Sequence, residues 1–167
     1  GVQYLQALGV KYVMVFTEAA KKRADLQPEL TMVRQSGPWN VYAVADSELV
    51  VPLAVQPVVV AEREGDPRER NLELGMSWFQ HQDEWAALPA DDGPDEWQRI
   101  EVAPDLARRQ DDRVDIVLPT TDIAPVELPA VTVSDVVLGG QDLRFSVDQI
   151  GVPVLVRMSY FPNWEVS

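Results

Sequence analysis

The feature that most constrains this fold is a regular alternation of apolar and polar residues near the end of the chain. It covers residues 143–148, and residues 154–160 repeat it. A period of two places the apolar side chains on one face of a β-strand. Gly139 and Gly140 predict a hairpin turn after a strand at 131–138. Antiparallel strands with one apolar face need a second layer, so we expect sandwich-like layers or a helix-covered sheet.

The first 60 residues predict an α/β start that ends in a hairpin. Apolar residues have helical spacing at 4–8, and the almost continuously apolar run at 10–16 predicts a strand covered on both faces. A helix then follows over 17–24, because Thr17 is a favourable N-cap. A hairpin over 30–45 turns at Ser36-Gly37-Pro38.

The middle segment, residues 61–130, is predicted to consist of helix and loop. Asp66 and Pro67 mark a helix start, and Leu72, Met76 and Phe79 would form its apolar face. The rest of the segment predicts a short helical turn, a loop, a strand, a charged connector and a second strand, at 85–88, 90–96, 97–102, 105–113 and 114–118.

The predicted fold class is therefore α+β and β-dominated, with antiparallel sheet or sandwich-like layers and a few short helices. We expect one domain over 1–167, with parts at 1–60, 61–130 and 131–167. The chain opens on Gly1 rather than methionine and stops inside a predicted strand. We interpret it as a soluble domain excised from a longer protein rather than as a small cytosolic protein with a processed start.

Charge and composition exclude several classes of function. The chain has 27 acidic and 14 basic residues, and residues 61–130 alone hold 18 acidic and 7 basic residues, a net charge of −11. Nucleic-acid binding needs clustered positive charge, so we expect no nucleic-acid partner. Without cysteine and with only His81, disulfides, cysteine zinc sites and three-histidine metal sites are excluded. We therefore expect no cofactor and no bound metal.

No motif in the sequence identifies a catalytic residue. His81 is the single imidazole, and no G-x-S-x-G or G-x-G-x-x-G pattern accompanies it, so a helix-end histidine is the favoured interpretation. Asp91, Asp92 and Asp95 form an acidic cluster that could hold a hard cation, although a solvated acidic turn is favoured. A carboxylate pair for glycoside hydrolysis stays open, because any two acids can meet in a fold.

The tryptophans and tyrosines suggest a binding surface. The chain holds five tryptophans, and three rings, Tyr160, Phe161 and Trp164, lie around Pro162. Aromatic rings can stack on sugars, so these three residues and Trp39 are candidate ligand-binding residues. The alternative is that most of the tryptophans are core anchors.

Three segments resemble a known family. They are GVKYVMV at 9–15, SGPWNVY at 36–42 and VLVRMSYFPNW at 154–164. The chain resembles the extracytoplasmic region of actinobacterial multi-spanning membrane proteins labelled 6-pyruvoyl-tetrahydropterin synthase-related, which are similar to YfhO-like proteins. The membrane part of that family resembles glycosyltransferases that use lipid-linked sugars. The pterin synthase named in the label holds zinc with three histidines, so one histidine excludes its chemistry here.

The resemblance implies a non-catalytic domain on the extracytoplasmic face of the cell membrane. Its partners would be the rest of its own membrane-spanning chain and a cell-envelope glycan, and the parent protein could be a membrane glycosyltransferase. A catalytic acid of such an enzyme would lie outside these residues, so no catalytic residue is assigned. The alternatives are a self-contained carboxylate-based hydrolase and a plain protein-interaction domain.

Overall fold

The computed structural model describes residues 1–61, 63–108, 114–158 and 165. The chain forms two compact units: unit 1 comprises Gly1–Pro52, Val131–Ile150 and Val154–Ser167, and unit 2 comprises Leu53–Ala130 and Gly151–Pro153. Many short strands and three α-helices make up the described residues, which confirms the predicted β-dominated α+β class. The prediction of one domain over 1–167 stays a prediction.

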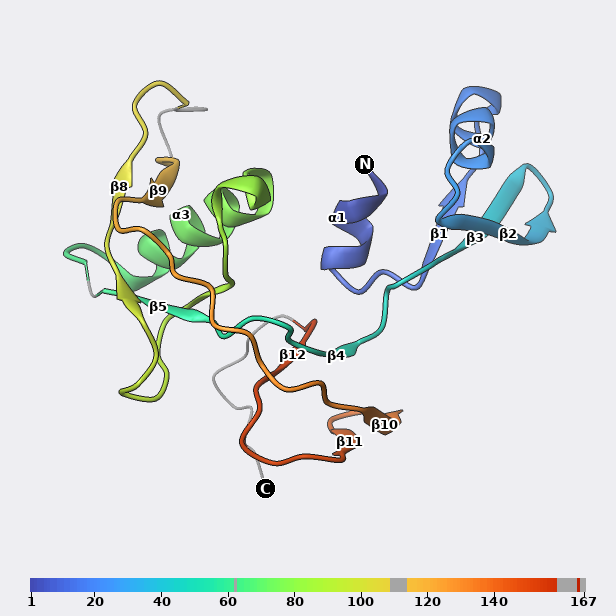
Figure 1. The fold of residues 1–167 in the computed structure, drawn as a ribbon. Coiled ribbons are helices and arrows are strands. Elements are labelled where there is room, and N and C mark those ends of the chain that lie inside the picture. Colours follow the sequence, from blue (N-terminus) through green and yellow to red (C-terminus); the bar gives the residue numbers. More distant parts are fainter. Residues whose placement is uncertain (62, 109–113, 159–164, 166–167) are drawn as a thin grey trace. The chain divides into compact units, whose positions relative to one another are not determined.

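The first sheet of unit 1 is antiparallel and has the strand order β1-β3-β2 (Figure 1). Its strands are β1 (Tyr12–Val15), β2 (Leu30–Ser36) and β3 (Trp39–Val44). The predicted hairpin turn is confirmed, and Gly37 adopts a positive φ of 55° there. Helix α2 (Glu18–Asp25) starts as predicted, because the Thr17 side chain accepts a hydrogen bond from the backbone N–H of Ala20 at 3.2 Å.

Among the residues that the structure describes, helices cover one face of this sheet. Asn40, Tyr42 and Val44 alternate along β3 and are buried. The Tyr42 hydroxyl donates to Asp25 of α2 at 2.6 Å, and helix α1 (Val2–Ala7) also contacts β3. The prediction that the run at 10–16 is covered on both faces is wrong, because alternate side chains of β1 are more than half exposed.

The later strands of unit 1 form two antiparallel pairs. The predicted hairpin is confirmed as β10 (Val133–Leu138) with β11 (Leu143–Val147). Strand β12 (Val154–Val156) pairs with β4 (Val50–Pro52). The strand predicted over 154–160 ends at Val156, because the Met158 N–H turns back to the Val156 carbonyl oxygen. Residues 159 and 160 lie outside the described residues.

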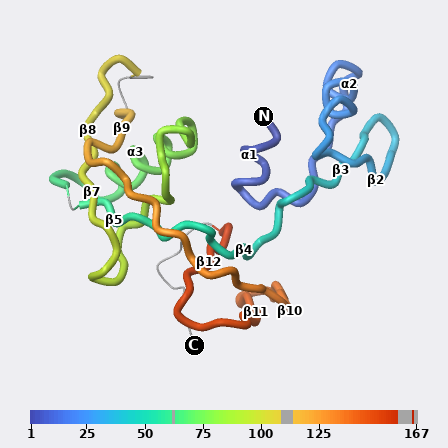
Figure 2. The backbone as a smooth tube through the Cα atoms, in the orientation of Figure 1, coloured from blue at the N-terminus to red at the C-terminus, as the bar shows by residue number. Residues whose placement is uncertain are grey.

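Unit 2 contains a small parallel sheet that the sequence did not predict. Strand β5 (Val58–Val60) lies between β6 (Pro89–Ala90) and β7 (Arg99–Ile100) and runs parallel to both. The chain passes from β5 to β6 through helix α3 (Pro67–Gln80) and the short 3₁₀ turn η1 (Gln82–Glu84). Figure 2 traces the backbone of this unit, with β5, β7 and α3 labelled. This is a strand–helix–strand unit around a parallel pair.

An antiparallel pair completes unit 2. Strand β8 (Val102–Pro104) pairs with β9 (Val117–Pro119). The strand predicted at 97–102 is thus divided between β7 and β8, and Glu101 separates them. The predicted start of α3 is confirmed, because the Asp66 carboxylate accepts hydrogen bonds from the backbone N–H groups of Arg68 and Glu69.

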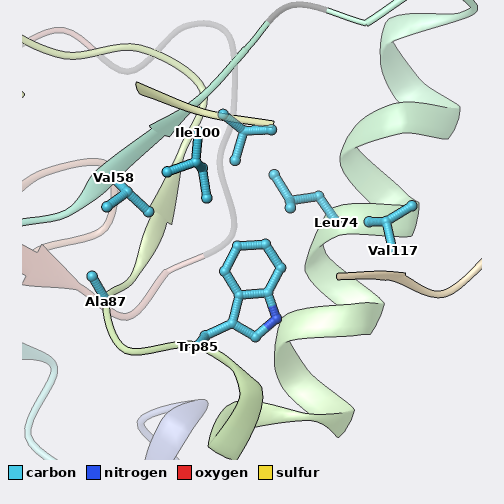
Figure 3. Packing of buried hydrophobic residues seen from close by; sticks show 7 residues of the cluster. Val58, Leu74, Trp85, Ala87, Ile100 and Val117 are labelled. Atoms are coloured by element: carbon cyan, nitrogen blue, oxygen red, sulfur yellow. The ribbon is translucent and has the colours of Figure 1, made fainter. Parts of the chain in front are cut away.

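The core of unit 2 lies between α3 and these strands. Figure 3 shows the Trp85 indole in the space between Val58 and Ile100 on the strand side and Leu74 of α3, with Val117 beside Leu74. The predicted apolar face of α3 is wrong in part, because Leu72 is 51% exposed. The helix instead buries Leu74 and Ser77, and the Ser77 hydroxyl finds a hydrogen-bond partner inside the core.

None of the helices in the described stretches is long and apolar enough to cross a membrane.

Candidate functional site

Unit 1 exposes an aromatic face on the uncovered side of its three-stranded sheet. Residues that face one another across antiparallel strands share one side of the sheet, and the register pairs Tyr12 with Ala43 and Met14 with Val41. Trp39 alternates with the buried positions of β3 and so lies on the same side. We call this surface the aromatic face; its members are Tyr12, Met14, Phe16, Trp39, Val41 and Ala43.

The rings of the aromatic face lie at the surface. Tyr12, Met14 and Phe16 are each exposed by more than half, and Trp39 is 38% exposed. The rings of Phe16 and Trp39 contact each other with centroids 4.9 Å apart and planes tilted by 54°. The Lys11 ammonium lies 5.8 Å from the centroid of the Tyr12 ring. A surface that presents several large apolar side chains together is typical of an interaction site.

The third strand gives the aromatic face a polar edge. The register pairs Thr31 with Ala43, Arg34 with Val41 and Ser36 with Trp39. All three side chains are exposed, so hydroxyl and guanidinium groups lie beside the apolar strip. The arrangement can therefore accept a ligand that is apolar on one side and rich in hydroxyl groups at its rim.

Of the four predicted ligand-binding aromatics, the structure places Trp39 on this face, while Tyr160, Phe161 and Trp164 lie outside the described residues. Trp85 is a core anchor, 7% exposed, as the alternative interpretation of the tryptophans expected. Tyr12 and Phe16 were not among the residues predicted to bind a ligand. These two residues and Met14 alternate along the run at 10–16, which indicates that they share one face of a strand. The prediction that both faces of this strand are covered left no exposed face for a ligand.

Unit 2 contains a hollow beside the parallel sheet. A cavity of about 370 Å³ is lined by Val60, Ala61, Arg63, Pro67, Arg70, Asn71, Leu74 and Asp91. A second cavity of about 220 Å³ shares Asn71, Leu74 and Asp91 and adds Gly75, Trp78, Leu88 and Pro89. We call the two cavities together the hollow. It lies between α3 and the carboxyl ends of β5 and β6, because Ala61 and Asp91 directly follow these strands.

The three predicted acidic residues do not converge. Asp91 lines the hollow. The Asp92 carboxylate accepts from the backbone N–H of Gly93 at 2.7 Å, and Asp95 is exposed and pairs with Arg99 at 3.6 Å. Within the described parts of the chain, no group of three histidine, cysteine, aspartate or glutamate side chains could hold a metal ion.

His81 lies at the C-terminal end of α3, as expected. Its Nδ1 atom is 3.5 Å from Nη1 of Arg108. The hydrogen bond that Arg108 donates to Glu84 raises the pKa of this guanidinium above its ordinary value. Among the described residues, the side chains linked to His81 by these contacts are therefore Arg108 and, through it, Glu84. Neither of them carries a hydroxyl group that could act as a nucleophile. A triad needs such a nucleophile.

Comparison with family models, curated proteins and solved structures gave no match to this chain.

Proposed function

We propose that this chain is a non-catalytic extracytoplasmic domain of a multi-spanning membrane protein and that it binds cell-envelope glycan through the aromatic face. The observation that carries the binding role is the exposed Phe16–Trp39 ring pair beside the polar edge of β2. The family resemblance supports the membrane placement and the choice of glycan.

The chemistry of the aromatic face suits a sugar. The C–H faces of a pyranose are apolar and pack on aromatic rings, while its hydroxyl groups point outward and need hydrogen bonds. The rings of Tyr12, Phe16 and Trp39 can pack on the C–H face of the sugar. The side chains of Thr31, Arg34 and Ser36 along the polar edge can form hydrogen bonds with its hydroxyl groups. A face of this kind holds its ligand without carboxylate pairs, so it supports binding and not hydrolysis.

The test is binding of purified envelope polysaccharides, measured on a glycan array and by calorimetry. We expect Trp39→Ala to weaken binding roughly fivefold, because stacking on an aromatic ring contributes on the order of 1 kcal/mol. The same experiment on Met14→Ala and Met32→Ala provides a matched pair. Both methionines are similarly exposed, at 57% and 53%, but the register places Met32 with Tyr42 on the opposite face.

Weaker binding by Met14→Ala than by Met32→Ala would support the aromatic face as the glycan surface. Binding to no envelope glycan would refute the glycan role, and the face would then fit the plain protein-interaction alternative, since exposed apolar patches also mark protein interfaces. The membrane placement has a separate test. A full-length gene product that lacks membrane spans would refute it and leave the binding role standing.

A further inference from the structure

The hollow of unit 2 has the position of a ligand site in parallel-sheet proteins. Strand β5 is central, its connection through α3 leads to β6 on one side, and the chain then passes from β6 to β7 on the other side. In open parallel sheets, ligands bind in the crevice outside the carboxyl ends of the strands. Ala61 and Arg63 follow β5, and Asp91 follows β6, so the hollow lies at this edge.

The size and floor of the hollow fit a small ligand. Its larger cavity, of about 370 Å³, is within the range of ligand pockets, which is roughly 300–1,000 Å³. Val60 and Leu74 are buried and form part of its lining, and the second cavity adds Trp78, Leu88 and Pro89. The lining therefore includes several apolar side chains, which suit the carbon skeleton of a ring-sized molecule.

The charged groups around the hollow have different partners. Arg63 is fixed, because its Nη1 pairs with Glu73 at 3.2 Å and its Nη2 donates to the carbonyl oxygen of Arg70 at 3.1 Å. Arg70 itself is half-buried. Among the described residues, no carboxylate forms an ion pair with its guanidinium, although residues 61–130 carry a net charge of −11. This guanidinium is available to an anionic group in the hollow.

We infer that the hollow binds a monosaccharide-sized polyhydroxylated acid. The anionic group of the ligand, a carboxylate or a phosphate, pairs with Arg70. Its hydroxyl groups donate to the Asp91 carboxylate and exchange hydrogen bonds with the Asn71 amide, since both side chains line the two cavities. This site is separate from the aromatic face, so either one can fail without the other.

The experiment measures binding of glucuronate, glucose 6-phosphate and glucose to the whole chain by calorimetry and by chemical-shift perturbation. We expect at least one of the two acids to bind and glucose to bind roughly tenfold more weakly or not at all, because a charge-assisted hydrogen bond is lost. Preference for glucuronate would identify a carboxylate ligand, and preference for the phosphate ester would identify a phosphate ligand.

The chain supplies a matched pair of arginine variants. Arg70→Gln should weaken binding of the acid roughly tenfold or more, while Arg68→Gln should leave it unchanged. Arg68 lies on the same helix, is exposed and does not line the hollow. The Arg70 carbonyl oxygen that Arg63 needs is retained in the first variant, and thermal unfolding followed by circular dichroism verifies its fold.

Binding of neither acid would overturn this inference, and so would equal binding of glucose and the acids or equal losses in Arg70→Gln and Arg68→Gln. Alanine, added as a fourth probe, tests a zwitterionic ligand whose ammonium group would pair with Asp91. Tighter binding of alanine than of both acids would also contradict a polyhydroxylated acid.

Discussion

The hydrogen bond between α3 and β9 offers the sharpest test of the core of unit 2. The Val117 backbone N–H donates to the Ser77 hydroxyl at 2.7 Å, and both residues are completely buried. Ser77→Ala removes the acceptor and leaves the N–H without a partner, which costs about 1–3 kcal/mol. Alanine has a higher helix propensity than serine, and this recovers about 0.5 kcal/mol. We therefore expect the free energy of unfolding to fall by about 1–2 kcal/mol.

The measurement is urea unfolding followed by tryptophan fluorescence, in which Trp85 reports on the same core. Ser134→Ala is the control, because that hydroxyl is exposed and donates to the neighbouring Asp135, so its effect should stay within about 0.5 kcal/mol. Hydrogen exchange of the Val117 amide adds a local measurement and should become faster in Ser77→Ala. An unchanged exchange rate together with a loss below about 0.5 kcal/mol would refute the reasoning.

Two further predictions concern a glycine and a carboxylate. Gly75 is exposed within α3, and an added Cβ would meet no atom within 4 Å, so Gly75→Ala should raise the free energy of unfolding by about 0.5–1 kcal/mol. Gly37 has a φ of +55°, which side chains rarely adopt, so Gly37→Ala should lower the free energy of unfolding. If urea unfolding showed Gly37→Ala to be more stable than Gly75→Ala, it would contradict both expectations. The Thr132 N–H donates to Asp148 at 2.8 Å and lowers the pKa of Asp148 below its ordinary value of 3.8. The folded-state pKa is the lower one, so this stabilisation is present above pH 3.8 and is lost as pH falls through the folded-state value. The stability difference between wild type and Asp148→Asn should therefore shrink below pH 3.8, and a constant difference would show that the charge is not stabilised.

The sequence predicted elements whose signals are local. Thr17 and Asp66 cap helices at the expected residues, because a capping side chain and its backbone partners lie within three residues of each other. The turn at Gly37 was equally local. The β10–β11 hairpin followed from apolar alternation and a glycine pair. In each case a few neighbouring residues determine the conformation, so a single sequence was sufficient.

The parallel sheet of unit 2 could not be predicted in the same way. Strands β6 and β7 have two residues each, and β5 has three. Segments this short show no periodicity. Their pairing joins residues about 30 and 40 positions apart, as Val58 with Pro89 and Val59 with Arg99. The hollow was equally hidden, since Arg70 and Asp91 come together only through this pairing. The sequence offered Asp91 only as part of an acidic cluster, for which a solvated turn was favoured over a cation site, and the described residues hold no group of three such side chains that could bind a metal ion.

Two errors share one physical cause, which is that hydrophobicity does not identify what a side chain will contact. The spacing of Leu72, Met76 and Phe79 predicted one apolar face of α3, but Leu72 is exposed and Leu74 is buried. The buried face nevertheless contains Ser77, since a strand 40 residues later supplies its hydrogen-bond partner. In the run at 10–16, apolar side chains on both sides of a strand suggested two covering layers. One side instead remains exposed. Tyr12, Met14 and Phe16 each keep more than half of their surface exposed when the chain folds, and a ligand or partner that covers this surface would bury the remaining apolar area.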